Sequence, residues 1–268
     1  MDPLDGSASH ASFLASPHRT VKHTTYFPVY DRLFSRFRGQ PITFLEIGVL
    51  GGGSLFMWRD YFGPQARIIG VELNPAAAKW REHGFEIFIG SQSDPEFWAE
   101  VMAEVGEVDI VLDDGGHRFQ QQIITYESLL PFVRDGGMLV VEDTHTSYIR
   151  NFGGPSPTSF VSYAKDIVNG MHHRSSVVHL EPPETEVWSV QFFDSIVAFE
   201  VDRSLARHGS KPIDNGGSDD AAETFNRRDP VEPDRYDLVE RFRYGTFDET
   251  PHYTGPSRPP DRRDNGQH

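Results

Sequence analysis

The sequence contains no cysteine among its 268 residues. A disulfide framework, a thiolate metal site and a thiol nucleophile are therefore excluded. Any metal that the chain binds has to be held by oxygen or imidazole ligands. Basic residues are also scarce, 25 against 40 acidic ones, and the net charge of −15 repels nucleic acid and anionic lipid. We therefore expect neither of them as a partner.

Long hydrophobic runs are missing as well. No stretch of the chain approaches the ~18 apolar residues of a membrane span. Residues 1–20 also lack a basic leader followed by an apolar block. These features predict a protein that does not enter the membrane and that lies in the cytoplasm. A length of 268 residues favours one large domain with extra segments, and a homo-oligomer is compatible with it.

What the sequence does contain is a regular alternation of short apolar runs and helix-like stretches. This alternation is typical of a parallel sheet covered by helices on both faces. The expected strands are 42–49, 66–73, 85–91, 108–114 and 137–144. The expected helices are 52–63, 74–84, 94–106, 119–137 and 157–173. Residues 186–202 read as two more strands around a turn at 193–194, which predicts an antiparallel hairpin at the sheet edge.

A glycine-rich turn follows the first expected strand. Gly48, Gly51 and Gly52 precede a helix there, and Glu46 lies near the end of the strand. The turn lacks the middle glycine of the dinucleotide fingerprint G-x-G-x-x-G. Glu72 lies at the tip of the next strand, where a carboxylate can accept both hydroxyls of an adenosine ribose. The combination predicts a nucleoside cofactor, and the alternative is an ordinary turn beside a capping carboxylate.

Carboxylates and histidines end two further expected strands. If these strands are neighbours, the side chains converge at the ligand-bearing edge of the sheet. Like charges this close repel one another unless a cation is present, so we expect Mg²⁺ or Mn²⁺ at this edge. Either acidic pair, taken singly, is also compatible with a helix cap. The first strand ends in Asp113, Asp114 and His117, and the second in Glu142, Asp143 and His145.

Five motifs together resemble the macrocin and mycinamicin family of sugar O-methyltransferases, which includes cephalosporin hydroxylase-like proteins. They are KHTTYFPVYD, EIGVLGGGSL, GVELNP, LDDGGH and VEDTHTSYIRNFGG, within residues 22–155. The resemblance implies a class I S-adenosylmethionine methyltransferase (Rossmann-like) fold, with a mostly parallel seven-stranded sheet that ends in an antiparallel hairpin. It also implies Mg²⁺-dependent methyl transfer to a sugar hydroxyl of a glycoside or oligosaccharide, for example a methylmannose polysaccharide of an actinobacterium.

The resemblance assigns a role to each candidate residue. Asp114, Glu142 and Asp143 would bind the metal. His117 would be the general base, and His145 is a second candidate for that role. Val21 departs from the family pattern, which often has an acidic residue at this position. The residues that would hold S-adenosylmethionine are Tyr26, Glu46, Gly48, Gly51, Gly52, Glu72, Ser91 and Asp113, with Tyr26 near the methionine end.

These assignments divide the chain into three parts. Residues 1–40 are expected to be a lead-in or lid, 41–202 the cofactor-binding catalytic domain, and 203–268 a polar C-terminal extension. Within the extension, 203–235 has too few apolar residues to offset the entropy of ordering, and we expect it to be flexible. Residues 235–247 are expected to form one short helix or a docking strand.

Two other functions remain open at this point. His117, Asp143 and His145 match the two-histidine, one-carboxylate triad of a non-haem iron hydroxylase. That interpretation leaves the glycine turn and Glu72 without a role. A cofactor-binding module without catalysis is the other alternative, and the complete set of candidate ligands argues against it.

Overall fold

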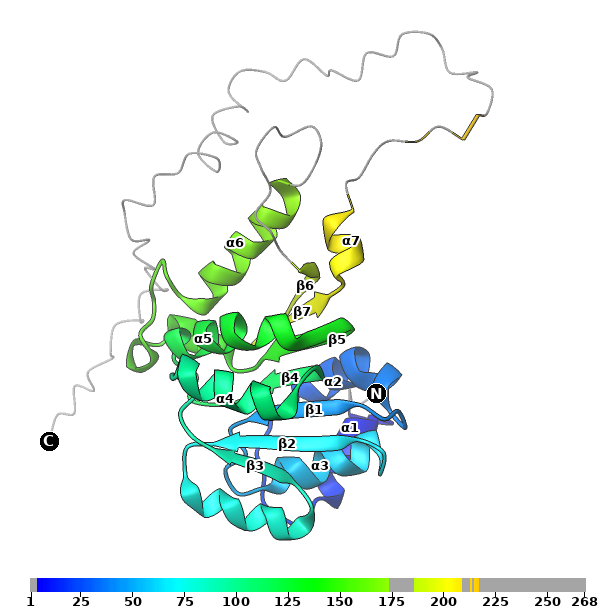
Figure 1. Cartoon of the computed structure of the whole chain (residues 1–268), viewed down its shortest axis with the longest axis vertical. Coiled ribbons are helices and arrows are strands. Elements are labelled where there is room, and N and C mark those ends of the chain that lie inside the picture. The colour runs from blue at the N-terminus through cyan, green and yellow to red at the C-terminus, as the bar shows by residue number, and fades with distance from the viewer. Residues whose placement is uncertain (1–3, 174–185, 209–212, 214, 217–268) are drawn as a thin grey trace, which may run out of the picture. The chain divides into compact units, whose positions relative to one another are not determined.

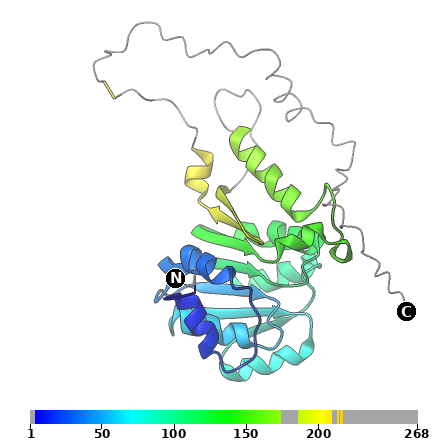
Figure 2. The same cartoon turned by 180° about the vertical axis from the view of Figure 1, so that it is seen from behind.

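The computed structural model describes residues 4–173, 186–208, 213 and 215–216 (Figures 1 and 2). Within these ranges seven strands form one sheet in the order β3-β2-β1-β4-β5-β7-β6. Neighbouring strands from β3 to β5 are parallel, whereas β7 is antiparallel to both β5 and β6. The expected mostly parallel sheet with a terminal hairpin is confirmed. The strands are β1 (Thr43–Ile47), β2 (Arg67–Glu72), β3 (Glu86–Ile89), β4 (Val108–Asp113), β5 (Val133–Val141), β6 (Val187–Phe193) and β7 (Ile196–Val201).

Helices cover both faces of the sheet and bury two apolar cores. Successive strand residues point to opposite faces, so that Phe44 belongs to one core and Leu45 to the other. Burial on both sides explains why the strands read as continuous apolar runs. One face carries α1 (Ala8–Ala15), α2 (Tyr26–Phe34), α3 (Gly53–Phe62) and the 3-10 helix η2 (Pro75–His83), and the other carries α4 (Pro95–Val105), α5 (Phe119–Leu129) and α6 (Phe160–His173).

The parallel strands of the sheet end at the same level. Ile47 pairs with both Val71 and Asp113, and Asp113 pairs with Val141. The two strands that end in carboxylates, β4 and β5, are therefore neighbours, as the predicted site requires, and β1 lies on the other side of β4. The turns that follow the three strands meet along one edge of the sheet.

The expected helix 119–137 is wrong in its second half. Helix α5 ends at Leu129, a short 3-10 helix η3 (Leu130–Phe132) follows, and β5 begins at Val133. Pro131 explains this early end, because it has no backbone N–H to donate to the carbonyl four residues earlier and its ring clashes with that carbonyl. The expected helix 74–84 is present, but it has 3-10 geometry and begins after Asn74, whose side chain accepts from Ala76 N.

The lead-in forms two helices that pack onto the sheet and α3. In α2, Tyr26, Tyr30 and Phe34 recur every four residues and are fully buried. Helix α1 is tied to α2 by Ser9 N, which donates to Asp31 Oδ1 at 2.9 Å. These contacts make residues 8–34 part of the same core as the sheet.

The beginning of the C-terminal extension also has structure. Residues Arg203–Arg207 form helix α7, and Arg203 makes ion pairs with Asp135 and Glu186. The prediction of a flexible segment is therefore wrong for 203–207. Its remainder from 217 on, and the helix or strand expected at 235–247, lie outside the described residues.

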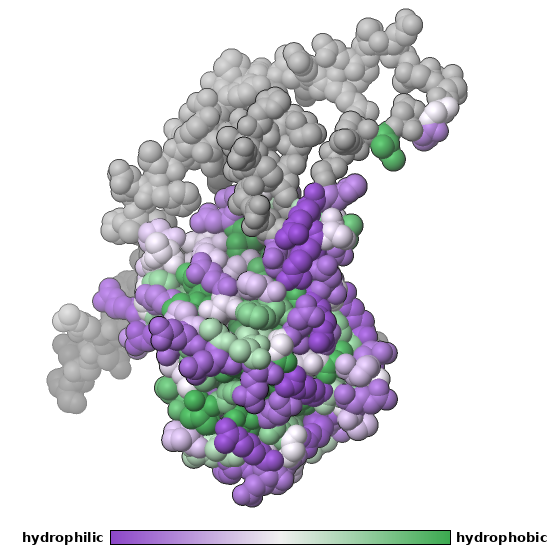
Figure 3. Space-filling view, in the orientation of Figure 1, coloured by the Kyte–Doolittle hydropathy of each residue, from purple (hydrophilic) through white to green (hydrophobic). Residues whose placement is uncertain are grey.

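Hydrophilic residues cover most of the face seen in Figure 3, and apolar residues gather between them in smaller areas. Across the described ranges, every helix is too short or too polar to cross a membrane.

Candidate active site

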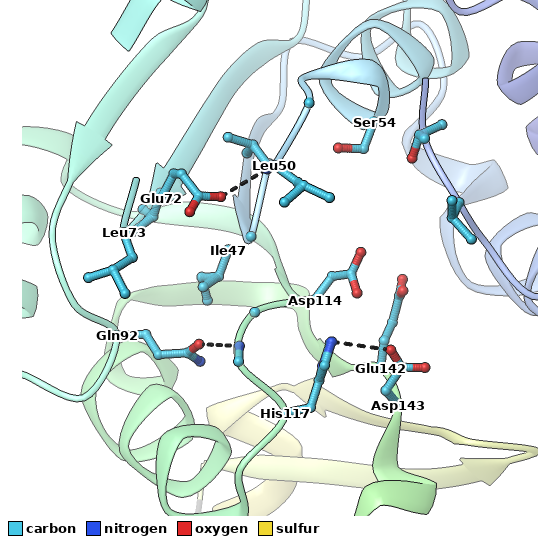
Figure 4. A pocket seen from close by; sticks show the side chains of 18 of the residues that line it. Ile47, Leu50, Ser54, Glu72, Leu73, Gln92, Asp114, His117, Glu142 and Asp143 are labelled. Atoms are coloured by element: carbon cyan, nitrogen blue, oxygen red, sulfur yellow. Dashed lines mark hydrogen bonds and ion pairs between the residues drawn. The ribbon is translucent and has the colours of Figure 1, made fainter. Parts of the chain in front are cut away.

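A pocket of about 720 Å³ lies at the carboxyl edge of the sheet, where the predicted site residues were expected (Figure 4). This volume is in the usual range for a small-molecule site. Its walls come from the lead-in and from the turns that follow β1, β2, β3, β4 and β5. The lining includes Arg19–His23, Tyr26, Ile47–Gly51, Gly53, Ser54, Val71–Leu73, Gly90–Gln92, Asp114–His117, Gln121, Glu142 and Asp143.

The turn after β1 and the tip of β2 form what we call the glycine end of the pocket. Gly48 has a positive φ of 87°, and a Cβ there would lie 2.1 Å from the carbonyl oxygen of Asp114. Only glycine fits this close contact between the two turns. The carboxylate of Glu72 accepts from Leu50 N at 2.9 Å and from Asn74 N at 3.0 Å, which fixes it at the rim.

Three residues expected at the cofactor lie behind the pocket wall. Glu46 is fully buried and accepts from Ser54 Oγ at 2.7 Å and Trp58 Nε1 at 3.0 Å. Burial raises its pKa to about 7. Asp113 is also buried, which raises its pKa, and Gly52 packs against an indole ring. Their contact with a cofactor stays a prediction.

The opposite end, which we call the carboxylate end, gathers Asp114, His117 and Asp143. One ligand atom from each lies within 4.8 Å of the others. His117 Nε2 is 3.4 Å from Asp143 Oδ2, whereas its Nδ1 is buried without a partner among the described residues. The three side chains are 19–24% exposed and face the cavity. His117 and Asp143 both have a positive φ, near 55°, which is uncommon for non-glycine residues although Asp and His adopt it more often than most.

Glu142 lies beside this group and has its own partners. Its Oε2 accepts from Lys22 Nζ at 2.9 Å, and its Oε1 accepts from the hydroxyl of Tyr30 at 2.5 Å. Lys22 Nζ also donates to Asp114 Oδ2 at 2.7 Å. Burial raises the pKa of Glu142, and the positive charge of Lys22 counters this rise. Burial alone would lower the pKa of Lys22, but the charges of Asp114 and Glu142 outweigh this and raise it.

Asp143 is surrounded by further donors. The hydroxyl of Tyr26 donates to its Oδ1 at 2.5 Å, and the rings of His23 and His145 lie 3.8 and 3.9 Å from the same oxygen. His145 Nδ1 is hydrogen-bonded to Ser195 Oγ at 2.5 Å, in the β6–β7 hairpin, and His145 does not line the pocket. Of the two histidines predicted as the base, His117 is therefore the one that faces the cavity.

Sequence reasoning gave no role to Lys22, Tyr30 or Gln92. The first two lie in the lead-in motif, which was the available signal. Gln92 is buried at the tip of β3, where its Nε2 donates to Asp113 and its Oε1 accepts from Gly116 N at 2.6 Å. No sequence pattern marks it, although it follows Ser91, which was predicted and lines the pocket.

The donor set fits a hard divalent cation. Carboxylate oxygens from the turns after β4 and β5 converge beside a cavity, and no thiol competes with them. The pocket also fits a nucleoside cofactor, because it runs from these carboxylates to Glu72 at the glycine end.

Comparison with known proteins places the fold. Residues 45–144 match a family model described as a methyltransferase domain. The MycE methyltransferase from the mycinamycin biosynthetic pathway, solved in complex with Mg, SAH and mycinamycin VI, aligns with a TM-score of 0.67 and 28% identity. This alignment covers 77% of our chain and 55% of that chain. The protein therefore has the fold of the class I S-adenosylmethionine-dependent methyltransferases.

Curated relatives narrow this class. The 8-demethyl-8-(2-methoxy-alpha-L-rhamnosyl)-tetracenomycin-C 3'-O-methyltransferase of Streptomyces olivaceus is 36% identical over 55% of this chain and 40% of its own length. The demethylmacrocin O-methyltransferase of Streptomyces fradiae is 32% identical over 68% of this chain and 47% of its own length. The chain is thus similar to sugar O-methyltransferases of the macrocin and mycinamicin type, in agreement with the resemblance seen in the sequence. The chain spans about half the length of these relatives.

Proposed function

We propose that this protein is an S-adenosylmethionine-dependent and Mg²⁺-dependent O-methyltransferase that acts on a sugar hydroxyl of a glycoside or oligosaccharide. One observation carries the proposal. The same cavity is lined at one end by the glycine turn and Glu72, and at the other by Asp114, His117 and Asp143. A methyl donor and a metal-assisted alcohol require these two ends side by side. The kinship with sugar O-methyltransferases supports it.

The glycine end would hold S-adenosylmethionine, which supplies the methyl group. Glu72 is fixed by two backbone donors at the rim, where it would accept the ribose hydroxyls of the cofactor. Gly48, Gly51 and Ser91 line the adjoining wall. Tyr26 lies toward the carboxylate end, where its hydroxyl is bonded to Asp143, and this position suits the methionine end of the cofactor.

The carboxylate end would hold the metal through Asp114, Asp143 and Glu142. When bound, a Mg²⁺ ion lowers the pKa of a hydroxyl that it contacts and fixes its orientation. Asp114 and Asp143 face the cavity directly. Both oxygens of Glu142 already accept hydrogen bonds, yet each carboxylate oxygen has a second lone pair for another partner.

His117 would take the proton that the sugar hydroxyl loses on methylation. Its Nε2 lies 3.4 Å from Asp143 Oδ2. The carboxylate of Asp143 would stabilise the imidazolium that forms. Histidine is the side chain that most often serves as a general base in enzymes.

The iron hydroxylase alternative is less well supported. It needs His117, Asp143 and His145 around one ion, but the group with converging ligand atoms contains Asp114 in place of His145. Oxygen consumption coupled to substrate conversion would revive this alternative.

Transfer of labelled methyl from S-adenosylmethionine to a panel of rhamnosyl and mannosyl glycosides tests the proposal. We expect product with Mg²⁺ and at least a hundredfold loss of rate in excess chelator, because several kcal/mol of stabilisation come from the ion. Asp143→Asn should lose the Mg²⁺ stimulation, whereas Asp135→Asn, at a half-exposed surface ion pair, serves as the matched control. Full activity in chelator would refute the role of the metal.

Product regiochemistry on the same panel identifies the acceptor. Among the predicted partners, the relatives support a sugar-bearing acceptor. The cytoplasmic location, the homo-oligomer and the exclusion of nucleic acid stay predictions.

A further inference from the structure

Lys22 is a buried cation in the wall of the carboxylate end. Its Nζ lies 2.7 Å from Asp114 Oδ2 and 2.9 Å from Glu142 Oε2, and its side chain is only 1% exposed. Tyr30 holds the other oxygen of Glu142 from the same lead-in. A buried ammonium with two carboxylate partners is not an ordinary surface ion pair, because solvent does not screen it.

Asp114 and Glu142 depend on Lys22 for their ionic partner. Within the described ranges, each makes its ion pair with Lys22. Asp143 has a different environment, with Tyr26 and three histidine rings around it. Without the ammonium, Asp114 and Glu142 would be two like charges close together in a region of low dielectric, where their repulsion is strong.

The charges also balance when a divalent ion is included. We define Asp114, Glu142 and Asp143 as the carboxylate cluster, which has three negative charges when ionised. A divalent ion offsets two of them. Lys22 supplies the remaining positive charge, so that the cluster with its ion is neutral overall.

We propose that Lys22 is a built-in counter-ion and positioning residue of the carboxylate cluster. It holds Asp114 and Glu142 side by side before the divalent ion binds and stays beside them afterwards. The second lone pair of each oxygen remains available for coordination. The role of Lys22 after the ion binds rests on the proposed metal site, whereas its role before the ion binds does not.

Thermal unfolding of the full chain tests the inference without an activity assay. In chelator, Lys22→Met should lower Tm by roughly 10 °C, the scale expected when one partner of a buried ion pair is removed. Added Mg²⁺ should raise the Tm of Lys22→Met more than that of the wild type, because the ion then supplies the missing charge. Lys79→Met is the matched control, since Lys79 is exposed beside Trp80 and far from the cluster in the sequence. It should respond to Mg²⁺ as the wild type does.

A charge-balanced variant keeps the test valid if Lys22→Met folds poorly. Lys22→Met combined with Glu142→Gln removes one positive and one negative charge, and it should recover much of the Tm lost by Lys22→Met alone. Equal Tm values for Lys22→Met and wild type in chelator would overturn the inference. So would a rise of Tm with Mg²⁺ that is equally large in both proteins, which indicates a merely structural lysine, or a double variant no more stable than Lys22→Met.

The proposed metal site can fail separately. If Mg²⁺ does not change the Tm of any variant, including the wild type, the metal assignment is wrong and the role of Lys22 after the ion binds falls with it. The Tm in chelator and the double variant still decide whether Lys22 holds the two carboxylates together.

Discussion

The carboxylates at the two ends of the pocket are stabilised by different kinds of partner. Glu72 at the glycine end, and Glu46 behind its wall, accept hydrogen bonds from neutral groups: two backbone amides for Glu72, and a serine hydroxyl and an indole for Glu46. At the carboxylate end, Asp114 and Glu142 share the ammonium of Lys22. Neutral donors fix the shape of the turn, whereas charged partners manage an excess of negative charge.

This difference indicates where each reactant belongs. At the glycine end, the carboxylate of Glu72 is held in place and can accept hydrogen bonds from the hydroxyls of a ligand. The carboxylate end keeps Asp114, His117 and Asp143 partly open, so it can accept an ion and move a proton. Substitutions at the two ends should therefore impair different steps.

The largest effect is expected at His117. His117→Gln should lower kcat for methyl transfer by about 10²–10⁴-fold, the usual contribution of a general base. Binding of S-adenosylmethionine, followed calorimetrically, should change little because the glycine end is intact. His145→Gln is the matched variant and should cost tenfold or less. A greater loss for His145→Gln would transfer the role of the base to His145.

An intermediate effect on stability is expected at Glu46. Burial raises its pKa to about 7 in the folded protein, from an ordinary value of 4.5. Between these two pH values the folded state binds more protons than the unfolded state, so stability falls as the pH rises. Relative to Glu46→Gln, the free energy of unfolding of the wild type should fall by up to about 3 kcal/mol between pH 4.5 and 7.5.

Chemical denaturation at a series of pH values measures this trend. Glu107→Gln, at an exposed side chain, is the control substitution. Parallel pH profiles for wild type and Glu46→Gln would contradict the prediction, and an opposite slope would mean that neutral donors hold Glu46 ionised.

The smallest effect is expected at Glu72. Glu72→Gln turns one of its two acceptor oxygens into a donor, so that either Leu50 N or Asn74 N loses its partner. We expect the Kd for S-adenosylmethionine to rise by about tenfold, as for the loss of one charge-assisted hydrogen bond. The response to Mg²⁺ should not change. Glu100→Gln, on the exposed side of α4, is the control, and an unaltered Kd would remove Glu72 from the cofactor site.

The sheet could be predicted from the sequence because its strands are buried on both faces. Runs such as VDIVLDD therefore stand out, and their polar ends mark the edge where ligands bind. The cluster of Asp114 with Asp143 followed from that geometry alone. The end of α5 could not be predicted from apolar spacing, because this spacing continues through Pro131 into β5.

The support of the site could not be predicted in the same way. Lys22 contacts Asp114 and Glu142, which lie 92 and 120 positions further along the chain. Local periodicity has no information about a contact of this range, and only the packing of α2 against the sheet shows it. Gln92 is similar, because a single amide in a loop gives no pattern before its partners are known.

The span between Lys22 and its partners has a consequence for the order of folding. Lys22 is synthesised first, and Glu142 follows 120 residues later, directly after β5. Helix α2 packs on α3 and β1 independently of β5, through the rings of Tyr30 and Phe34. The contacts of Lys22 and Tyr30 with Glu142 need β5 in place, and contacts over such a sequence distance form slowly. We therefore expect the charged centre to assemble only after β5 has joined the sheet.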